Sequence, residues 1–522
     1  MRIYRSPFPE VTIPACSLPE LVFQQVLRYA DKPALIDGPT GRSLTYGQLY
    51  RQAHAFAAGL AARGFRKGDV LALYSPNLPE YAVVFYGVAL AGGITTTVNP
   101  LYTVDELAYQ LADSGARLLV TVPPLLATAQ AAAARTGVQE VMVIGQGEGA
   151  TPLAEVLQSE AEPYVVTIDP STDLVALPYS SGTTGRPKGV MLTHANLVAN
   201  VVQTLAAEQF APDEVLIGIL PFYHIYGMTV ILSMALYAGT TVVTMPRFDL
   251  EQFLTLLERH AITTAFLVPP IILALAKHPL VDRYNLSKLR YVNSGAAPLP
   301  EPVARQCADR LGVVVRQGYG LTETSPVTHF TPRGYAIKLT SVGVAVPNTE
   351  FRIVDVATRE DVPEQEAGEL WIRGPQVMKG YWKNPQATRD VLDEEGWLHT
   401  GDVARVDAEG YVYIVDRVKE LIKYKGYQVA PAELEEILQG HPAVADVAVI
   451  PSPDEEAGEV PKAFVVLKPG MQASAEELMA YVAARVAPYK KIRRIAFVEQ
   501  IPKTLSGKIL RRELIARERG SA

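Results

Sequence analysis

The chain has 522 residues, of which 48% are hydrophobic, 20% charged and 8% aromatic. This length exceeds one ordinary hydrophobic core, and the composition excludes a disordered or fibrous protein. The formal charge of -7 argues against a surface that coats nucleic acid. The cysteines, Cys16 and Cys307, are too far apart for a metal-binding or redox motif, and the N-terminus lacks an apolar leader. We therefore expect a cytoplasmic protein.

Strand-like and helix-like stretches alternate through most of the chain, which predicts an α/β fold. Capping-box patterns at residues 17–20 and 103–106 predict the starts of two helices, and the first helix is expected to run through Leu27. Short apolar runs such as 70–73 and 118–122 predict buried strands between the helices. No period of 20–50 residues repeats, which argues against a solenoid or a propeller.

One long segment, residues 215–246, contains no Lys, Arg, Asp or Glu and is long enough to span a bilayer. Pro221, His224, Gly227 and Gly239 interrupt it, and the Val/Thr run at its end predicts a strand. We favour a buried interior segment over a membrane span, and expect no integral membrane segment.

The sequence changes character after an alternating run at 411–415 that predicts a strand. We place a boundary at 416–419, between a large N-terminal α/β region of several subdomains (1–416) and a small, mobile C-terminal α+β domain (417–522). The elements expected in the small domain are a helix at 431–439 between Pro431 and Gly440, strands at 444–450 and 462–468, a helix opened by Ser474 and a strand at 495–499.

The strongest local motif is YSSGTTGRPKGV, at residues 179–190. Small hydroxyl residues and unhindered backbone N–H groups bind polyphosphates, and Lys188 adds a positive charge. The spacing differs from the Walker A pattern, in which Lys and Ser/Thr end the loop directly before a helix. A flexible Gly/Ser turn is the alternative, but the density of hydroxyls and the embedded Pro-Lys-Gly favour a phosphate-binding loop.

This loop resembles the phosphate loop of the adenylate-forming superfamily, which includes acyl-CoA synthetases, peptide-synthetase adenylation domains and luciferases. Four further signatures follow in family order, and the resemblance covers about residues 15–515. They are QGYGLTE at 317–323, TGD at 400–402, DRVKELIKYKGYQ at 416–428 and IPKTLSGK at 501–508. The resemblance implies an AMP-forming acid–thiol ligase. With ATP and Mg²⁺, such an enzyme makes an acyl-adenylate and pyrophosphate, then passes the acyl group to coenzyme A (CoA) and releases AMP. We expect a monomer or a homodimer.

The resemblance also implies roles for individual residues of the nucleotide site. Tyr319 would stack on adenine, Asp402 and Arg417 would hold the ribose hydroxyls, and Thr184 and Glu323 would bind Mg²⁺. A carboxylate activated by ATP gathers negative charge, which a cation and a metal must neutralise. The other residues expected at ATP or CoA are Ser180, Ser181, Gly182, Thr183, Lys188, Gly295, Ala296, Ala297, Gln317, Gly318, Gly320, Thr322, Lys425 and Gly426.

Lys508 is the residue that the resemblance implies most strongly for catalysis. It would reach the substrate carboxylate and the α-phosphate, and stabilise the pentacovalent transition state. Its basic neighbours, Arg511, Arg512 and Arg517, are expected only to solvate a helix.

The same small domain carries a second reactive motif. In the family, this domain uses one face for adenylation and, after a rotation, another face for thioester formation. That division assigns Gln428 and Lys423 to the thioester step, makes Lys419 the hinge, and gives Gly426 close access to pantetheine.

The acyl pocket is expected around His224, in the motif PFYHIYG. A lone His there is usually a core residue, but the resemblance places it beside the carboxylate. The phrases FYHIY, ELIKYKGYQVAPAE and APYKK most resemble 4-coumarate–CoA ligases and their bacterial relatives. Plant members carry a lysine where this chain has Asn293, and often Asn where it has Thr229. The residues expected to shape the pocket are His224, Ile225, Tyr226, Thr229, Val268, Pro269, Asn293, Gly318, Gly320, Pro326 and Val327.

The expected acid is a 4-coumarate-like or cinnamate-like aryl acid, and a medium- or long-chain fatty acid is the alternative, because the pocket residues are mostly apolar. A carrier-protein-loading ligase is weakened because no carrier domain with a phosphopantetheine serine is visible. A luciferase-like oxygenase shares the motifs. A non-enzymatic nucleotide-binding module would be expected to lack Lys508 or Glu323, and both are present.

Overall fold

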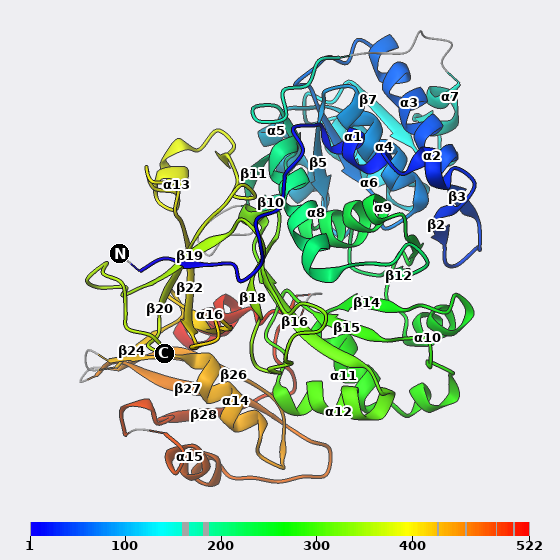
Figure 1. Ribbon diagram of the computed structural model, residues 1–522. Helices are drawn as coiled ribbons and strands as arrows, with labels where there is room; N and C mark the ends of the chain where they lie inside the picture. Colours follow the sequence, from blue (N-terminus) through cyan, green and yellow to red (C-terminus); the bar gives the residue numbers. More distant parts are fainter. Residues whose placement is uncertain are drawn as a thin grey trace.

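The computed structural model shows a mixed α/β protein with a large N-terminal domain and a smaller C-terminal domain (Figure 1). The described residues form four sheets, of which three belong to the large domain. The described ranges are 2–158, 166–180, 187–424, 427–454, 457–486, 488–504 and 507–520.

The first sheet has the order β10-β11-β9-β5-β4-β6-β7-β8, with β21 beside β11. Its central strands are parallel, and helices connect them as in repeated βαβ units. The strands are β4 (Val70–Tyr74), β5 (Ile94–Val98), β6 (Ala116–Thr121), β7 (Glu140–Val143), β8 (Thr151–Pro152), β9 (Leu174–Ala176), β10 (Tyr179–Ser180), β11 (Lys188–Thr193) and β21 (Gly380–Tyr381). The helices are α3 (Tyr46–Ala62), α4 (Pro79–Leu90), α5 (Val104–Ser114), η1 (Pro123–Leu125), α6 (Leu126–Ala133) and α7 (Leu153–Leu157).

The second sheet has the order β18-β17-β16-β15-β14-β12-β13-β2-β3, and its strands from β2 to β16 in this order are parallel. Its strands are β2 (Pro33–Asp37), β3 (Ser43–Thr45), β12 (Val215–Gly218), β13 (Thr241–Thr244), β14 (Thr264–Leu267), β15 (Tyr291–Ser294), β16 (Val314–Gly320), β17 (Val327–Phe330) and β18 (Val344–Ala345). The helices around it are α1 (Leu18–Phe23), α2 (Val26–Tyr29), α8 (His194–Glu208), the π-helical η2 (Tyr226–Ser233), α9 (Met234–Ala238), α10 (Leu250–Arg259), α11 (Pro269–Lys277), η3 (Pro279–Arg283), α12 (Glu301–Leu311) and η4 (Thr322–Thr324).

One continuous core joins these two sheets. Helix α4 contacts β4 and β5 of the first sheet and β2 of the second, and it is buried on nearly every face. A helix that is apolar all round is stable only when protein covers it on all sides. The two sheets therefore share one hydrophobic core.

The third sheet is antiparallel, in the order β1-β19-β20-β22-β23. Its first strand comes from the N-terminus, so that Tyr4 pairs with Phe351. The elements are β1 (Tyr4–Arg5), β19 (Glu350–Val354), β20 (Gly368–Arg373), α13 (Pro385–Arg389), β22 (Leu398–Val406) and β23 (Val412–Arg417).

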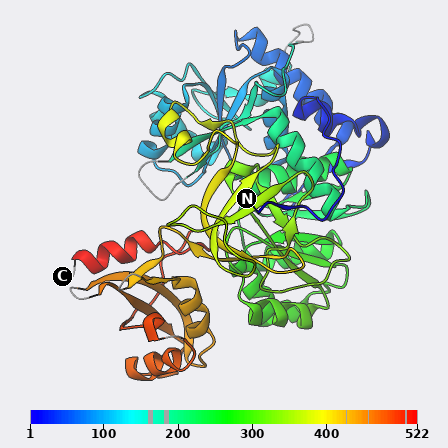
Figure 2. The ribbon, with the colours of Figure 1, turned by 60° about the vertical axis from the view of Figure 1, so that its left-hand side comes forward.

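The C-terminal domain stands apart from the rest, in orange and red in Figure 2. Its two main core clusters contain only residues from Ile422 onward. The sheet order is β25-β24-β27-β26, with β28 beside β27. The elements are β24 (Ile422–Tyr424), β25 (Tyr427–Val429), α14 (Pro431–Gln439), β26 (Val444–Asp454), β27 (Gly458–Leu467), α15 (Ala475–Ala483), η5 (Pro488–Lys490), β28 (Arg494–Phe497) and α16 (Arg511–Gly520).

Both predicted capping boxes form, and the uncharged segment is buried in the interior as expected. Ser17 and Thr103 accept the N–H groups of Glu20 and Glu106 at the starts of α1 and α5. Residues 215–246 form β12, η2, α9 and β13, which are largely buried. Among the described residues, no helix combines the length and the apolarity that crossing a bilayer requires.

The first helix was expected through Leu27, and this was wrong. Helix α1 ends at Phe23, and α2 starts only at Val26. Leu27 is 99% exposed, so the apolar pattern there does not mark a face that packs on the core. Without burial on that side, tertiary contacts do not extend the helix beyond its first turns.

A buried ion pair joins α8 to β16, and its contribution to stability can be tested by mutation. The guanidinium of Arg316 lies 2.9 Å from Glu208, and both side chains are fully buried. Glu208→Leu should lower the free energy of unfolding by about 3–5 kcal/mol, because it leaves an uncompensated buried cation. Urea unfolding followed by tryptophan fluorescence measures the loss.

The matched control is Glu301→Leu, which breaks an exposed i,i+4 pair with Arg305. It should cost about 0.3–0.5 kcal/mol. Equal losses in the two variants would contradict the role of the buried pair.

Candidate active site

The phosphate-binding motif forms a β-hairpin at the edge of the first sheet. Ser180 of β10 pairs in register with Lys188 of β11. The hydroxyl of Tyr179 donates to Oδ2 of Asp113 at 2.6 Å, which ties the base of the hairpin to α5. Of the expected cofactor-binding residues, Ser181, Gly182, Thr183, Thr184, Lys425 and Gly426 lie outside the described residues.

Tyr381 connects Lys188 of this hairpin to Glu323, the expected metal ligand. Nζ of Lys188 lies 4.7 Å from the ring centroid of Tyr381. The hydroxyl of Tyr381 donates to Oε1 of Glu323 at 2.8 Å. Burial and the Glu323 charge raise the pKa of Tyr381, so the phenol keeps its proton. Tyr381 thus lies between Lys188 and Glu323 and fixes the orientation of the carboxylate.

Asp402 connects two other expected residues of the site. Its Oδ2 accepts from the Tyr319 hydroxyl at 2.6 Å, and its Oδ1 lies 3.0 Å from Nε of Arg417. Burial raises the pKa of Asp402, while Arg417, Tyr319 and Lys508 counteract the rise. The structure therefore brings together the residues expected at adenine and ribose, although they come from β16, β22 and β23.

Lys508 approaches this cluster from the C-terminal domain. Its charge interacts with those of Arg417, Glu420 and Asp402. The preceding Gly507 touches α11 closely: a Cβ atom there would lie 2.8 Å from Cδ of Pro270. The loop carrying Lys508 therefore faces the large domain.

The other expected residues of the small domain lie on different elements. Lys423 is exposed on β24, and its N–H donates to Glu459 of the same domain. The backbone of Gln428 lies opposite Lys423 in β25, and its side chain is outside the described part. Lys419 is exposed in the turn between the two domains.

The acyl region follows the carboxyl ends of parallel strands, where ligands bind in open α/β sheets. His224 precedes η2, and part of its surface is accessible to solvent. Desolvation by the surrounding protein lowers the pKa of its imidazole to about 4. The imidazole is therefore neutral near pH 7. Its Nδ1 accepts the N–H of Tyr226 at 3.2 Å. π-Helical segments are rare in proteins, but those that occur often lie at functional sites. The sequence pattern did not predict that η2 is π-helical.

Several other residues expected around the acyl group are buried and apolar. Ile225, Val268 and Val327 are buried. Asn293 has no exposed surface, and within the described residues neither atom of its amide, nor the hydroxyl of Thr229, has a hydrogen-bond partner. Two buried polar groups are thus available in otherwise apolar surroundings.

Several glycines bring backbone close to side chains here. A Cβ on Gly295 would lie 2.7 Å from the ring of Tyr226, and one on Gly320 would lie 2.0 Å from the oxygen of Pro326. A Cβ on Gly318 would lie 3.0 Å from Cδ2 of Phe330. Any larger residue would displace these contacts.

The remaining expected residues frame the same edge. Gln317 uses its amide on the backbone, accepting from the N–H of Leu299 and donating to the oxygen of Leu339. Ala296 has a φ of +68° in the exposed turn after β15, Ala297 follows it, and Thr322 opens η4. Gln317 thus shapes the site through the loops it holds.

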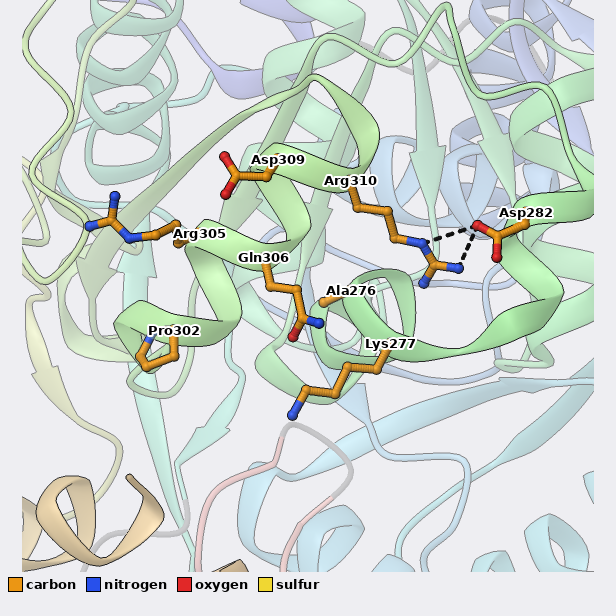
Figure 3. Close-up of a pocket in the computed structure, with 8 residues that line it drawn as sticks. All are labelled: Ala276, Lys277, Asp282, Pro302, Arg305, Gln306, Asp309 and Arg310. Carbon is orange, nitrogen blue, oxygen red and sulfur yellow. Dashed lines mark hydrogen bonds and ion pairs between the residues drawn. The ribbon is translucent and has the colours of Figure 1, made fainter. Parts of the chain in front are cut away.

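A surface hollow of about 890 Å³ lies between α11 and α12 (Figure 3). Its Arg310 turns toward Asp282, with Nη2 2.7 Å from Oδ1. None of the residues expected at the active site lines it. Its lining residues are Ala276, Lys277, Asp282, Pro302, Arg305, Gln306, Asp309 and Arg310.

Comparison with known proteins agrees with this geometry. Two family models match, one described as AMP-binding enzyme over residues 22–382 and one as AMP-binding enzyme C-terminal domain over residues 433–508. A 4-coumarate–CoA ligase 1 of Petroselinum crispum is 42% identical over 525 residues, which cover 99% of this chain and 96% of that protein. The chain belongs to the AMP-binding enzyme family.

Solved structures resemble this AMP-binding enzyme along nearly its whole length. The anthranilate CoA ligase AuaEII, in complex with anthranoyl-AMP, has a TM-score of 0.88 and 26% identity, covering 97% of this chain and 98% of its own. ATP-bound MatB of Rhodopseudomonas palustris has a TM-score of 0.88 and 30% identity, covering 96% and 99%; its apo form scores 0.79. The protein is an AMP-forming acid–thiol ligase, which activates an acid with ATP as an adenylate and ligates it to CoA.

The sequence motifs did not identify several residues of this AMP-binding enzyme's site. Tyr381 and Asp113 orient Glu323 and the phosphate hairpin from distant parts of the chain. Arg511, expected to solvate a helix, is instead only 13% exposed and pairs with Glu420 and Glu435. Arg512 and Arg517 are exposed, as expected. The partners of Arg511 are 91 and 76 residues away in sequence, so no local pattern indicates them.

The environment of Lys508 predicts how adenylation depends on pH. Burial and the nearby Arg417 lower the pKa of Lys508 below its usual 10.5. The protonated amine is the form that can stabilise negative charge, so the rate should fall as pH rises through this lowered pKa. Lys508→Arg should keep part of the activity and lose this alkaline decline, because a guanidinium stays charged. ATP–pyrophosphate exchange between pH 7 and 10.5 measures both.

The matched control for this profile is Lys503→Arg, on the same loop but paired at the surface with Asp446. It should keep the wild-type alkaline limb. An unchanged limb in Lys508→Arg would contradict the assignment to Lys508.

Proposed function

We propose that this AMP-binding enzyme ligates a 4-coumarate-like or cinnamate-like aryl acid to CoA. The observation that carries the proposal is the 42% identity with a 4-coumarate–CoA ligase along 99% of the chain. We also propose that it acts in the cytoplasm, where ATP and CoA are supplied; Cys16 and Cys307 are free.

The aromatic side chains of the expected acyl region support a flat substrate. The rings of Tyr226 and Phe266 meet edge to face at 6.2 Å, and Tyr226 packs against Gly295. Aromatic walls beside glycine backbone accommodate a planar ring. Asn293 and Thr229 add hydrogen-bonding groups that a ring hydroxyl could satisfy, because buried polar groups without partners cost about 1–3 kcal/mol each.

The positions of the reactive residues support a different role for each domain. We assign residues 1–416 to the domain that holds ATP and the acid, and 417–522 to the domain that supplies Lys508. Lys508 would hold the attacking carboxylate beside the α-phosphate, near Arg417 and Asp402. Gln428 and Lys423 would serve the thioester step after rotation about Lys419, with Lys425 and Gly426 near pantetheine.

The residues present fit one Mg²⁺ ion. Among the described residues, no group of three or more His, Cys, Asp or Glu side chains could hold a metal by themselves. Mg²⁺ is usually held by one or two carboxylates together with substrate phosphates and water. Glu323, oriented by Tyr381, would hold it together with Thr184. The bound ion would neutralise charge on the phosphates of ATP.

The two half-reactions can be separated by mutation. Lys508→Ala should abolish ATP–pyrophosphate exchange, while ATP binding and the reaction of preformed acyl-adenylate with CoA are retained. Gln428→Ala should do the reverse and mainly slow the thioester step. Unchanged exchange in Lys508→Ala, or equal losses of both half-reactions in Gln428→Ala, would contradict this division.

The acid can be identified with a substrate panel. Thioester formation with ATP, Mg²⁺ and CoA should have its highest kcat/KM with 4-coumarate or cinnamate, among acids that also include acetate, octanoate and palmitate. A maximum with octanoate or palmitate would favour the fatty-acid alternative, which the apolar Ile225, Val268 and Val327 also suit.

Asn293→Leu sharpens this panel, since the substitution keeps the approximate volume and removes the amide. It should lower kcat/KM for 4-coumarate relative to cinnamate by about tenfold, the equivalent of about 1.4 kcal/mol. Cinnamate, which lacks the ring hydroxyl, is the internal control. An equal loss with both acids would show that the amide does not recognise the hydroxyl.

A further inference from the structure

A partly buried cluster of charged side chains lies where the two domains join. Arg511, the first residue of α16, donates from Nη1 to Glu420 at 2.6 Å and from Nη2 to both oxygens of Glu435 at 2.7 Å. Its Nε donates to the oxygen of Val449 at 3.2 Å. Glu420 belongs to the turn after β23, and Glu435 to α14. One guanidinium therefore fastens the interdomain turn to the start of α16.

This cluster lies next to the catalytic loop. Arg511 is three residues after Lys508, and both interact with the charge of Glu420. The loop itself is closed by bonds between Thr504 and Lys508: each N–H donates to the other residue, one to the Lys508 oxygen and one to the Thr504 hydroxyl. Because these bonds join Thr504 to Lys508, the position of Lys508 depends on where the neighbouring chain, including Arg511, is held.

Asp416 extends the cluster across the domain boundary. It is the buried residue before Arg417 in β23, the last strand of the large domain. Its Oδ2 accepts the N–H of Ala432, in the first turn of α14, at 2.8 Å. Helix α14 has no side-chain bond from its own N-cap residue, Ala430. The large domain thus supplies the cap to a helix of the small domain.

The surroundings of Asp416 make this bond strong. Arg511 faces the carboxylate, whereas Glu420 opposes its charge. Oδ1 accepts the N–H of Arg417 at 2.7 Å. Burial raises the pKa of Asp416 to about 6 and that of Glu435 to about 7. Charge-assisted bonds to a helix N-terminus are among the stronger hydrogen bonds in proteins.

We propose that Asp416 is a positioning residue for Lys508, which holds the small domain in the orientation for adenylation by capping α14 across the domain boundary and facing Arg511. The inference rests on the proposed role of Lys508. Asp416 acts through α14 and Arg511, and needs no contact with ATP or the acid. When its bond to Ala432 is broken, the small domain keeps its fold but loses one of the contacts that fix its orientation.

The test uses the two half-reactions of the full-length enzyme. Asp416→Ala should lower kcat for ATP–pyrophosphate exchange by about 10²-fold, the loss that a misplacement of about 1 Å can cause. The KM for ATP and the reaction of preformed acyl-adenylate with CoA should change by less than about twofold. Asp416→Asn keeps an acceptor for Ala432 but lacks the charge, so its exchange rate should lie between those of Asp416→Ala and the wild type.

The matched control is Glu433→Gln, in the same first turn of α14, where Glu433 pairs at the surface with Lys490 of the small domain. It should leave both half-reactions unchanged. Exchange at the wild-type rate in Asp416→Ala would overturn the proposal, as would equal losses in both half-reactions. A raised KM for ATP alone would also overturn it, because the effect would then come from Arg417. A wild-type enzyme that exchanges pyrophosphate with no acid would instead contradict the proposed function.

Discussion

The site depends on keeping one buried carboxylate charged and fixed. Asp402 would be unstable as an isolated anion in the interior, because burial of an unpaired charge is costly. The Tyr319 hydroxyl and the Arg417 guanidinium offset that cost from two different sheets. The same contacts therefore fix the second sheet against the third and set the direction in which the chain leaves for the small domain. The proposed nucleotide site and the placement of the small domain thus share these contacts.

The junction between the domains is chemically unlike their interiors. Each domain has its own apolar core, whereas a small apolar group around Val403, Leu421 and Ala430 accompanies the polar contacts at the junction. Hydrogen bonds and ion pairs can be exchanged for water at little net cost, but a large apolar interface cannot. A mostly polar junction is suited to the proposed rotation of the small domain between the two half-reactions.

Much of the fold could be predicted because its signals are local. Capping residues, the apolar segment 215–246 and the order of elements after Pro431 depend on neighbours within a few positions. The roles of Lys188 and Glu323 were predicted from motif resemblance and stay predictions. Arg511 could not be predicted, since its partners come from the interdomain turn and α14, and its own surroundings in sequence are those of a solvated helix. The π-helical η2 likewise follows from packing and not from composition.

The N-terminal strand has a consequence for how this protein is made. Arg5 pairs with Glu350, 345 residues further along the chain. At about 5–20 residues per second, the ribosome takes tens of seconds to synthesise that partner. During this time the first two sheets can assemble, while β1 must stay unpaired and resist joining a wrong sheet edge. Strand β1 has only two residues, so it contributes little pairing energy to the native sheet. The same short length makes it a weak template for aggregation.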